Sequence, residues 1–401
     1  MAGDEFEKPI PFHSGHSPDS VADSSKGGSA RRLRKICVSA IVVGLVFTAL
    51  GGTPNRRSLP YLAGGLVALV LLTILAPRVS QRRSSTLRVS STLALLATTL
   101  FLLTLLGETG LHLFFSQDFR PIPPGLGYAY AKTLGWFPTP NDHRSLSITV
   151  INNTKGFRGA EFRKNDQPGI VFLGDSFVWG HGVEVTDRFT EKLQSSHPEW
   201  NIYNLGITGY GTDQEYLLLQ RYFDELKPRL VFLVFCSEND REDNSLNARY
   251  NSFKPYYTVT AHGLKLNGVP VPRSEHLLCL EHPLLSKSYL FRLVVRTYKN
   301  MTLPVERSYS DPTTIILAEI QRYVKERQSI LVVGLTATDP ALERFLQDSN
   351  IPWVDLTTQH RFSEDYHWSP EGHTFVCARI EQFLLGGKYL SSSHAPAAGR
   401  P

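Results

Sequence analysis

The chain has 401 residues, which allows one or two domains, and 42% of them are hydrophobic, which is enough for a sizeable core. The formal net charge of +5 is modest, and much of the basic excess lies beside apolar runs in the first quarter of the chain, so we attribute it to membrane topology and not to nucleic-acid binding. The four cysteines show no CxxC or other metal-ligand spacing, so no zinc site is predicted.

The N-terminal quarter predicts a tail followed by membrane-spanning segments. Residues 1–30 are rich in Ser, Gly, Pro and Asp and have no apolar period, which predicts a disordered cytoplasmic tail. Apolar runs follow at about residues 36–52, 59–76 and 89–106. Each is close to the ~20 residues that cross a bilayer, so we expect three transmembrane helices within residues 31–107. Buried globular helices are the alternative, but three such runs so close together favour the membrane.

Basic residues flank these runs unequally. They are Arg31, Arg32, Arg34 and Lys35 before the first run, only Arg56 and Arg57 between the first and second, and Arg78, Arg82, Arg83 and Arg88 between the second and third. The positive-inside bias therefore places the N-terminus and the second loop in the cytoplasm, and everything after about Gly107 outside it. We expect a multi-pass inner-membrane protein whose remaining part is periplasmic or otherwise extracytoplasmic.

The rest of the chain predicts a connector and one large α/β domain. Residues 108–166 are irregular, rich in Gly, Pro and aromatic residues, and predict a juxtamembrane connector that packs on the domain that follows. Residues 167–388 then alternate between strands and helices, apart from residues 241–311, which predict an insertion over the sheet edge and a candidate lid. Residues 389–401 predict a disordered tail. The expected strands are 170–173, 202–205, 230–235, 330–334 and 352–356, and the expected helices are 189–196, 213–226, 313–328, 340–348 and 370–386.

Chemically useful groups follow several of these strands. Ser176 offers a hydroxyl after Gly174-Asp175, Gly209 a backbone N–H in a Gly-rich turn, and Asn239 a side-chain amide. His367 precedes the last helix and can take a serine proton, while a nearby carboxylate fixes its tautomer. The Ser176 N–H, the Gly209 N–H and the Asn239 amide together can hold a developing oxyanion. Each motif alone is typical of an ordinary turn, and it is their order along the chain that favours a catalytic site.

The order Gly-Asp-Ser, Asn-x-Gly-x-x-Gly, Asn-Asp, Asp-x-His resembles the SGNH (GDSL-type) hydrolase superfamily over about residues 168–386, apart from the insertion. The resemblance implies a three-layer α/β/α fold with a flavodoxin-like parallel sheet, here preceded by three transmembrane helices. It also implies esterase or acyl-transfer chemistry with no cofactor and no metal. Ser176 then resembles the nucleophile, Gly209 and Asn239 the oxyanion donors, and His367 the base.

The sequence departs from the family pattern at two places. Ser237-Glu238-Asn239-Asp240 stands where the family often has Gly-x-Asn-Asp, and Glu364 stands three residues before His367, where many members have Asp. Asp365 is our choice for the carboxylate that orients His367, and Glu364 is the second choice.

We therefore expect a membrane-anchored serine ester hydrolase or O-acyltransferase that acts outside the cytoplasm on acyl esters of envelope glycans, by location and family analogy. Its expected partners are an acyl-ester substrate, an envelope polysaccharide and the lipid bilayer, with no nucleic acid. The alternative is a catalytically silent domain that binds glycan or scaffolds a membrane complex. His373 is predicted to be structural. Cys236 and Cys377 are predicted to be free and buried, with a disulfide among them and Cys279 left open.

Overall fold

The computed structural model describes residues 85–114, 127–140, 142–145, 148–163, 167–250, 252–273, 278, 287–303, 305, 310–387 and 389–390. The predicted N-terminal tail, the first two predicted membrane helices and most of the C-terminal tail lie outside the described residues. The chain divides into two compact units. Of the described residues, those from 127 to 273 and from 305 to 390 belong to the large unit, and those from 85 to 114 and from 278 to 303 belong to the helical unit.

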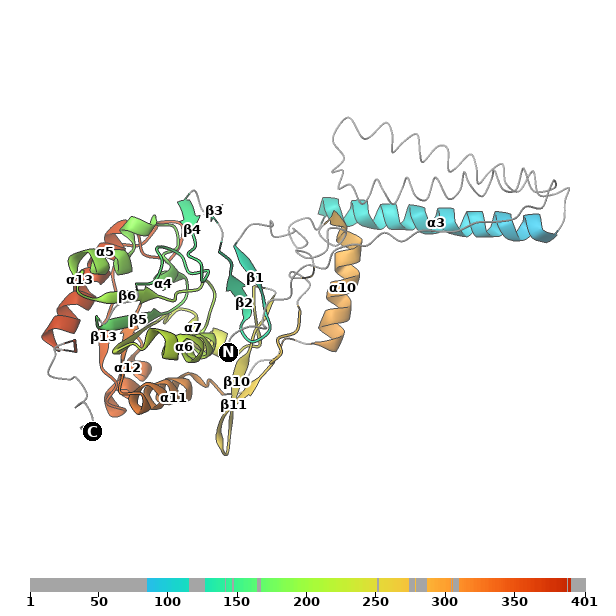
Figure 1. Ribbon diagram of the computed structural model, residues 1–401. Helices are drawn as coiled ribbons and strands as arrows, with labels where there is room; N and C mark the ends of the chain where they lie inside the picture. Colours follow the sequence, from blue (N-terminus) through green and yellow to red (C-terminus); the bar gives the residue numbers. More distant parts are fainter. Residues whose placement is uncertain are drawn as a thin grey trace, which may run out of the picture. The chain divides into compact units, whose positions relative to one another are not determined.

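The described part of the helical unit consists of α3 (Ser85–Phe114) and α10 (Tyr289–Thr302), shown in blue and orange in Figure 1. Helix α3 contains the third predicted apolar run and continues for about two turns beyond it. Within the described ranges, α3 is the one helix long and apolar enough to cross a membrane, with a candidate span of Leu95–Phe114. The number of membrane crossings stays a prediction.

A five-stranded parallel sheet forms the centre of the large unit, in the order β6-β5-β7-β12-β13 (Figure 1). The strands are β5 (Gly169–Leu173), β6 (Asn201–Asn204), β7 (Leu230–Phe235), β12 (Ile330–Leu335) and β13 (Trp353–Asp355). Numbered along the chain, this order is 2-1-3-4-5, the flavodoxin-like order, and it reverses between β5 and β7. The predicted parallel-sheet α/β fold is confirmed.

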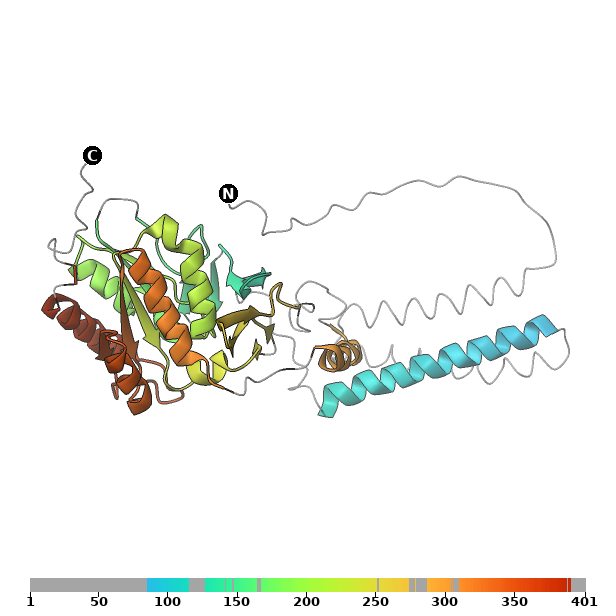
Figure 2. The same ribbon diagram turned by 90° about the horizontal axis from the view of Figure 1, so that it is seen from below.

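Helices cover both faces of this sheet. Helices α6 (Thr212–Leu226), α11 (Thr313–Glu326) and α12 (Pro340–Asp348) pack on one face, and α5 (Phe189–Ser196) and α13 (Pro370–Gly386) pack on the other. Figure 2 shows α13, in red, on the opposite side of the strands from α11, in orange. Successive side chains along a strand point to opposite faces of the sheet. Val171 and Val231 therefore join the core under α6, α11 and α12, and Phe172 and Phe232 join the core under α5 and α13. All six residues of β7 are buried because both faces are covered.

Helix α13 begins as predicted. The Ser369 hydroxyl accepts the Gly372 N–H at 3.3 Å, and Pro370 occupies the first helical position, where its missing N–H costs nothing. This cap matters for function because the Asp365-to-His367 segment lies immediately before it.

The predicted irregular connector is partly wrong. It contains two antiparallel hairpins, β1 (Tyr128–Ala131) with β2 (Gly135–Pro138) and β3 (Asp142–Ser145) with β4 (Ile148–Ile151). Each strand has four residues, which is too short for a clear alternation in the sequence. Leu134, Trp136 and Phe137 join the same core as α6, so this segment is part of the large unit.

The predicted insertion contains several short elements before α10. They are α7 (Asp240–Asn244), β8 (Ala248–Arg249), β9 (Ser252–Phe253), β10 (Tyr256–Thr260) and β11 (Gly263–Asn267). Strands β10 and β11 form an antiparallel hairpin, with Thr260 opposite Gly263. Lys254 makes a buried ion pair with Asp213 of α6, and Tyr257 lies in the core. This part is therefore anchored on α6, while a lid role stays a prediction.

Candidate active site

Ser176 lies where β5 passes directly into a short helix. The predicted turn is instead α4 (Ser176–Trp179), whose first residue is Ser176 and whose N-cap is Asp175. The Asp175 carboxylate accepts the Phe177 N–H at 2.9 Å. A Cβ on Gly174 would lie 2.3 Å from Val178 Cγ2, so only glycine fits this close approach. Ser176 is thereby held at the carboxyl end of the sheet.

The structure brings Ser176, His367 and Asp365 together. The Ser176 Oγ lies 2.7 Å from His367 Nε2, across 191 residues of chain. On the other side of the ring, Asp365 Oδ1 lies 3.1 Å from His367 Nδ1 and accepts the His367 backbone N–H at 2.8 Å. A proton on Nδ1 that faces Asp365 leaves the Nε2 lone pair directed at the serine hydroxyl. Glu364, the second choice, is exposed, and no hydrogen bond or ion pair joins it to His367 among the described residues.

The Asp365 carboxylate lies between two imidazoles. Its Oδ2 is 3.5 Å from His181 Nε2, and the His181 ring stacks on His367 with centroids 4.1 Å apart. Partial burial raises the pKa of Asp365, but the hydrogen bonds and charge of His367 lower it more, so the pKa lies below its usual value. Burial, and then the nearby His367, lower the pKa of His181 to about 4. His181 is therefore neutral at neutral pH.

The predicted oxyanion donors lie at the ends of neighbouring strands. The Ser176 N–H belongs to the first turn of α4, where helical N–H groups have no partner within the helix. Gly209 follows β6 with a φ of +76°, and a Cβ there would lie 2.4 Å from Tyr250 Cε2. Asn239 follows β7 and is buried, with Nδ2 3.4 Å from Asp175 Oδ2. Their convergence on one substrate oxygen stays a prediction.

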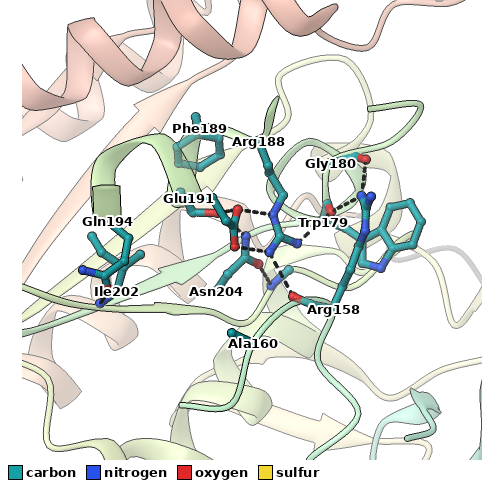
Figure 3. A network of polar contacts seen from close by, with 12 residues as sticks. Arg158, Ala160, Trp179, Gly180, Arg188, Phe189, Glu191, Gln194, Ile202 and Asn204 are labelled. Carbon is teal, nitrogen blue, oxygen red and sulfur yellow. Dashed lines mark hydrogen bonds and ion pairs between the residues drawn. The ribbon is translucent and has the colours of Figure 1, made fainter. Parts of the chain in front are cut away.

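Two buried arginines hold the loop that carries His181 (Figure 3). Arg158 donates to the carbonyls of Trp179 at 3.2 Å, Gly180 at 2.7 Å and Val183 at 2.7 Å. Arg188 donates to the Trp179 carbonyl at 3.1 Å and is paired with Glu191. Burial, and then the charge of Arg188, lower the pKa of Arg158 to about 10, so it stays charged at neutral pH.

Sequence reasoning missed both arginines, because neither lies in a recognisable motif. The signal in the sequence that could have indicated a close contact here is Gly180. Its φ is +84°, and a Cβ there would lie 2.6 Å from Arg188 Cδ. A loop glycine of this kind indicates that another group approaches the backbone closely.

A group of buried carboxyls behind Ser176 was also missed. Asp175, Glu215 and Asp240 are each at most 1% exposed. Burial, followed by their mutual repulsion, raises the pKa of Glu215 and of Asp240 well above the usual value. Burial also raises the pKa of Asp243 to about 7. These raised pKa values favour the protonated form of the group, which limits the negative charge beside Ser176.

Among the described residues, two groups of side chains come close enough to share a metal ion. They are His181 with Asp365 and His367, and Asp175 with Cys236 and Asp240. In the first group His367 Nε2 already faces Ser176 Oγ. The absence of a metal or cofactor stays a prediction. Cys236 and Cys377 are free and buried, as predicted, and Cys37 and Cys279 lie outside the described residues.

A scan against protein-family models finds no match, and a search of curated proteins finds no related sequence. The solved structures to which the chain is similar include three named as lipolytic enzymes or esterases. A G-D-S-L family lipolytic protein from Veillonella parvula shares 13% identity over 53% of this chain and 96% of its own, with a TM-score of 0.32. The esterase EstA from Pseudoalteromonas sp. shares 7% identity over 55% and 99%, with a TM-score of 0.33. A lipase/acylhydrolase from Enterococcus faecalis shares 13% identity over 55% and 97%, also with a TM-score of 0.33. Because these values are low, we base the function on the geometry of the site.

Proposed function

We propose that this chain is a serine ester hydrolase or O-acyltransferase that works through an acyl ester on Ser176. The observation that carries the proposal is the 2.7 Å contact between Ser176 Oγ and His367 Nε2, with Asp365 on the opposite ring nitrogen. A buried serine, a histidine and a carboxylate in this relation form the unit that activates a hydroxyl as a nucleophile.

The contact distances support proton transfer from Ser176 to His367. The Ser176 hydroxyl donates to His367 Nε2 at 2.7 Å in preference to Asp175 Oδ2 at 3.3 Å. When Oγ attacks an ester carbonyl, His367 takes the proton and Asp365 stabilises the imidazolium. The carbonyl oxygen becomes an oxyanion, for which the Ser176 N–H, the Gly209 N–H and the Asn239 amide are the proposed donors.

Collapse of this intermediate breaks the bond to the alcohol, which leaves with the proton from His367. A second acceptor then attacks the Ser176 ester, and His367 takes its proton and returns it to Ser176 Oγ. Water as acceptor yields a free acid, and a sugar hydroxyl yields a new ester.

We further propose that the site works outside the cytoplasm of a multi-pass inner-membrane protein, on acyl esters of envelope glycans. The apolar span of α3 and the excess of arginines before it support this topology. A reporter fused after residue 120 is expected to work only if it is one that needs an extracytoplasmic location. Signal from a reporter active only in the cytoplasm overturns the topology and the envelope substrate.

Replacement of Ser176 by Ala tests the chemistry. In the full chain in detergent, we expect Ser176→Ala to lower the hydrolysis of p-nitrophenyl acetate by about 10⁴-fold or more, His367→Ala to lose nearly as much, and the double variant to lose little further. Asn239→Ala, which removes one oxyanion donor, is expected to lose only about 10²–10³-fold. The thermal unfolding midpoint serves as the folding control. Full activity of Ser176→Ala refutes the proposal and favours the silent glycan-binding or scaffold domain.

A further inference from the structure

Helix α10 carries an exposed apolar stripe. Phe291, Val294, Tyr298 and Met301 recur at steps of three and four, so they lie along one face of the helix. Their exposed fractions are 49%, 57%, 64% and 81%. A helix of a globular domain normally buries such a face against a core. Contiguous exposed apolar side chains of this kind mark a surface that contacts a partner or a membrane.

The charges of α10 indicate which partner fits the stripe. The helix contains Arg292, Arg296 and Lys299 and no acidic residue. Arg292 is buried, whereas Arg296 and Lys299 are partly exposed. An amphipathic helix that combines an apolar stripe with basic residues is typical of helices that lie in a lipid interface, where the basic groups face the headgroup phosphates.

Contacts attach the start of α10 to α3. The Glu108 carboxylate of α3 accepts the Ser288 hydroxyl at 3.0 Å and the backbone N–H groups of Tyr289 and Leu290 at 2.6 Å and 2.9 Å. It therefore satisfies the first donors of α10 with a negative charge, which also suits the positive end of the helix. His112 of α3 packs edge-on against Tyr289, with ring centroids 5.3 Å apart. Figures 1 and 2 agree that α10 starts beside the C-terminal end of α3.

The position of Glu108 along α3 indicates the depth of this junction. Residues 89–107 contain no charged side chain, and Arg88 and Glu108 are the first charges on either side. At about 1.5 Å per residue this stretch is about 28 Å long, close to the ~30 Å thickness of a bilayer hydrocarbon core. Glu108 falls inside the candidate span Leu95–Phe114, but a charge inside the hydrocarbon core is costly, so the uncharged residues 89–107 fill the core and Glu108 belongs at its boundary. Helix α10 then begins at the membrane surface.

We propose that α10 lies in the membrane interface, with the stripe of Phe291, Val294, Tyr298 and Met301 in the acyl chains and with Arg296 and Lys299 toward the headgroups. The partner of this surface is the lipid bilayer. The inference rests on the proposed membrane anchoring and goes beyond it, because it assigns a second membrane contact to residues 289–302, far from the apolar runs in the sequence.

Spin labels on the full chain test the proposal. Met301→Cys and Val294→Cys place a nitroxide on the stripe, and Asn300→Cys places one on the other side of the helix, because two residues beyond Tyr298 correspond to more than half a turn. The background carries Cys37→Ser and Cys279→Ser, while Cys236 and Cys377 stay because they are buried. The protein is reconstituted in vesicles of phosphatidylcholine and phosphatidylglycerol. Accessibility to oxygen and to a water-soluble nickel complex is then measured.

The proposal predicts that both stripe labels are several-fold more accessible to oxygen than to the nickel complex, and that the Asn300→Cys label shows the reverse. Equal exposure of all three labels to the nickel complex overturns it. If the protein also resists extraction from the vesicles by carbonate and still hydrolyses the ester, this result overturns only the placement of α10 and leaves the membrane anchoring and the proposed function standing. Loss of the protein from the vesicles overturns the anchoring and the proposal together. Labels shielded from both reagents indicate a protein partner and also overturn it.

Discussion

Replacement of Asp365 by Asn tests which carboxylate orients His367. Asp365 Oδ1 lies 3.1 Å from His367 Nδ1, and the ring gains a positive charge when it takes the Ser176 proton. At that separation, two unit charges attract by about 5 kcal/mol at an effective dielectric constant of ~20 and by about 1.3 kcal/mol in bulk water. Because the Asp365 side chain is 36% exposed, we expect an intermediate value. A value of about 3 kcal/mol corresponds to roughly a hundredfold loss of kcat/KM.

The assay is p-nitrophenyl acetate hydrolysis by the full chain in detergent, with Glu364→Gln as the matched control. Glu364 is exposed, so its replacement is expected to change kcat/KM by about twofold at most. Since the contacts with His367 hold the pKa of Asp365 below its usual value, we expect protonation of Asp365 to lower the wild-type rate only at a pH below the usual range of an aspartate. Equal losses in the two variants, or an Asp365→Asn variant with more than about half the activity, refute the assignment.

Two further predictions concern buried cations and histidines. Arg158→Met removes three hydrogen bonds to carbonyls of the His181 loop, of which the Trp179 carbonyl keeps Arg188 as a donor, so we expect a loss of about 3 kcal/mol in unfolding free energy by urea titration and a lower kcat. The exposed control Arg163→Met is expected to change neither the unfolding free energy nor kcat. Equal effects of the Arg158 and Arg163 variants contradict the role given to Arg158. Burial lowers the pKa of His373 to about 3, so the unfolded state alone binds this proton between about pH 6.5 and 3, and stability falls as the pH falls through that window. Between pH 6 and 4 we expect the unfolding free energy of the His373→Gln variant to fall by about 1.4 kcal/mol less per pH unit than that of the wild type. Parallel plots of unfolding free energy against pH for the two proteins contradict this.

Local patterns in the sequence predicted the elements of the sheet accurately. The apolar run of β7 was predicted from Leu230 to Phe235, and the structure has the same limits. Helix α12 was also predicted with its observed limits, Pro340–Asp348, because Pro at its first position marks the start. Hydrophobic period and cap residues act over a few neighbours, so they can be read without knowledge of the fold. The hairpins β1–β2 and β3–β4 were missed because four-residue strands carry too little of this pattern.

The sequence by itself determined that strands alternate with helices and that Ser176, Gly209, Asn239 and His367 stand next to their ends. Only the tertiary structure decided what surrounds them. Arg158 donates to the carbonyls of Trp179, Gly180 and Val183 from a separate segment of the chain. Glu215 of α6 is buried by tertiary packing. The charge state of a buried group depends on desolvation and on neighbours from distant parts of the chain. These contacts have no local pattern, and they appear only when the sheet order brings β5 and β7 side by side.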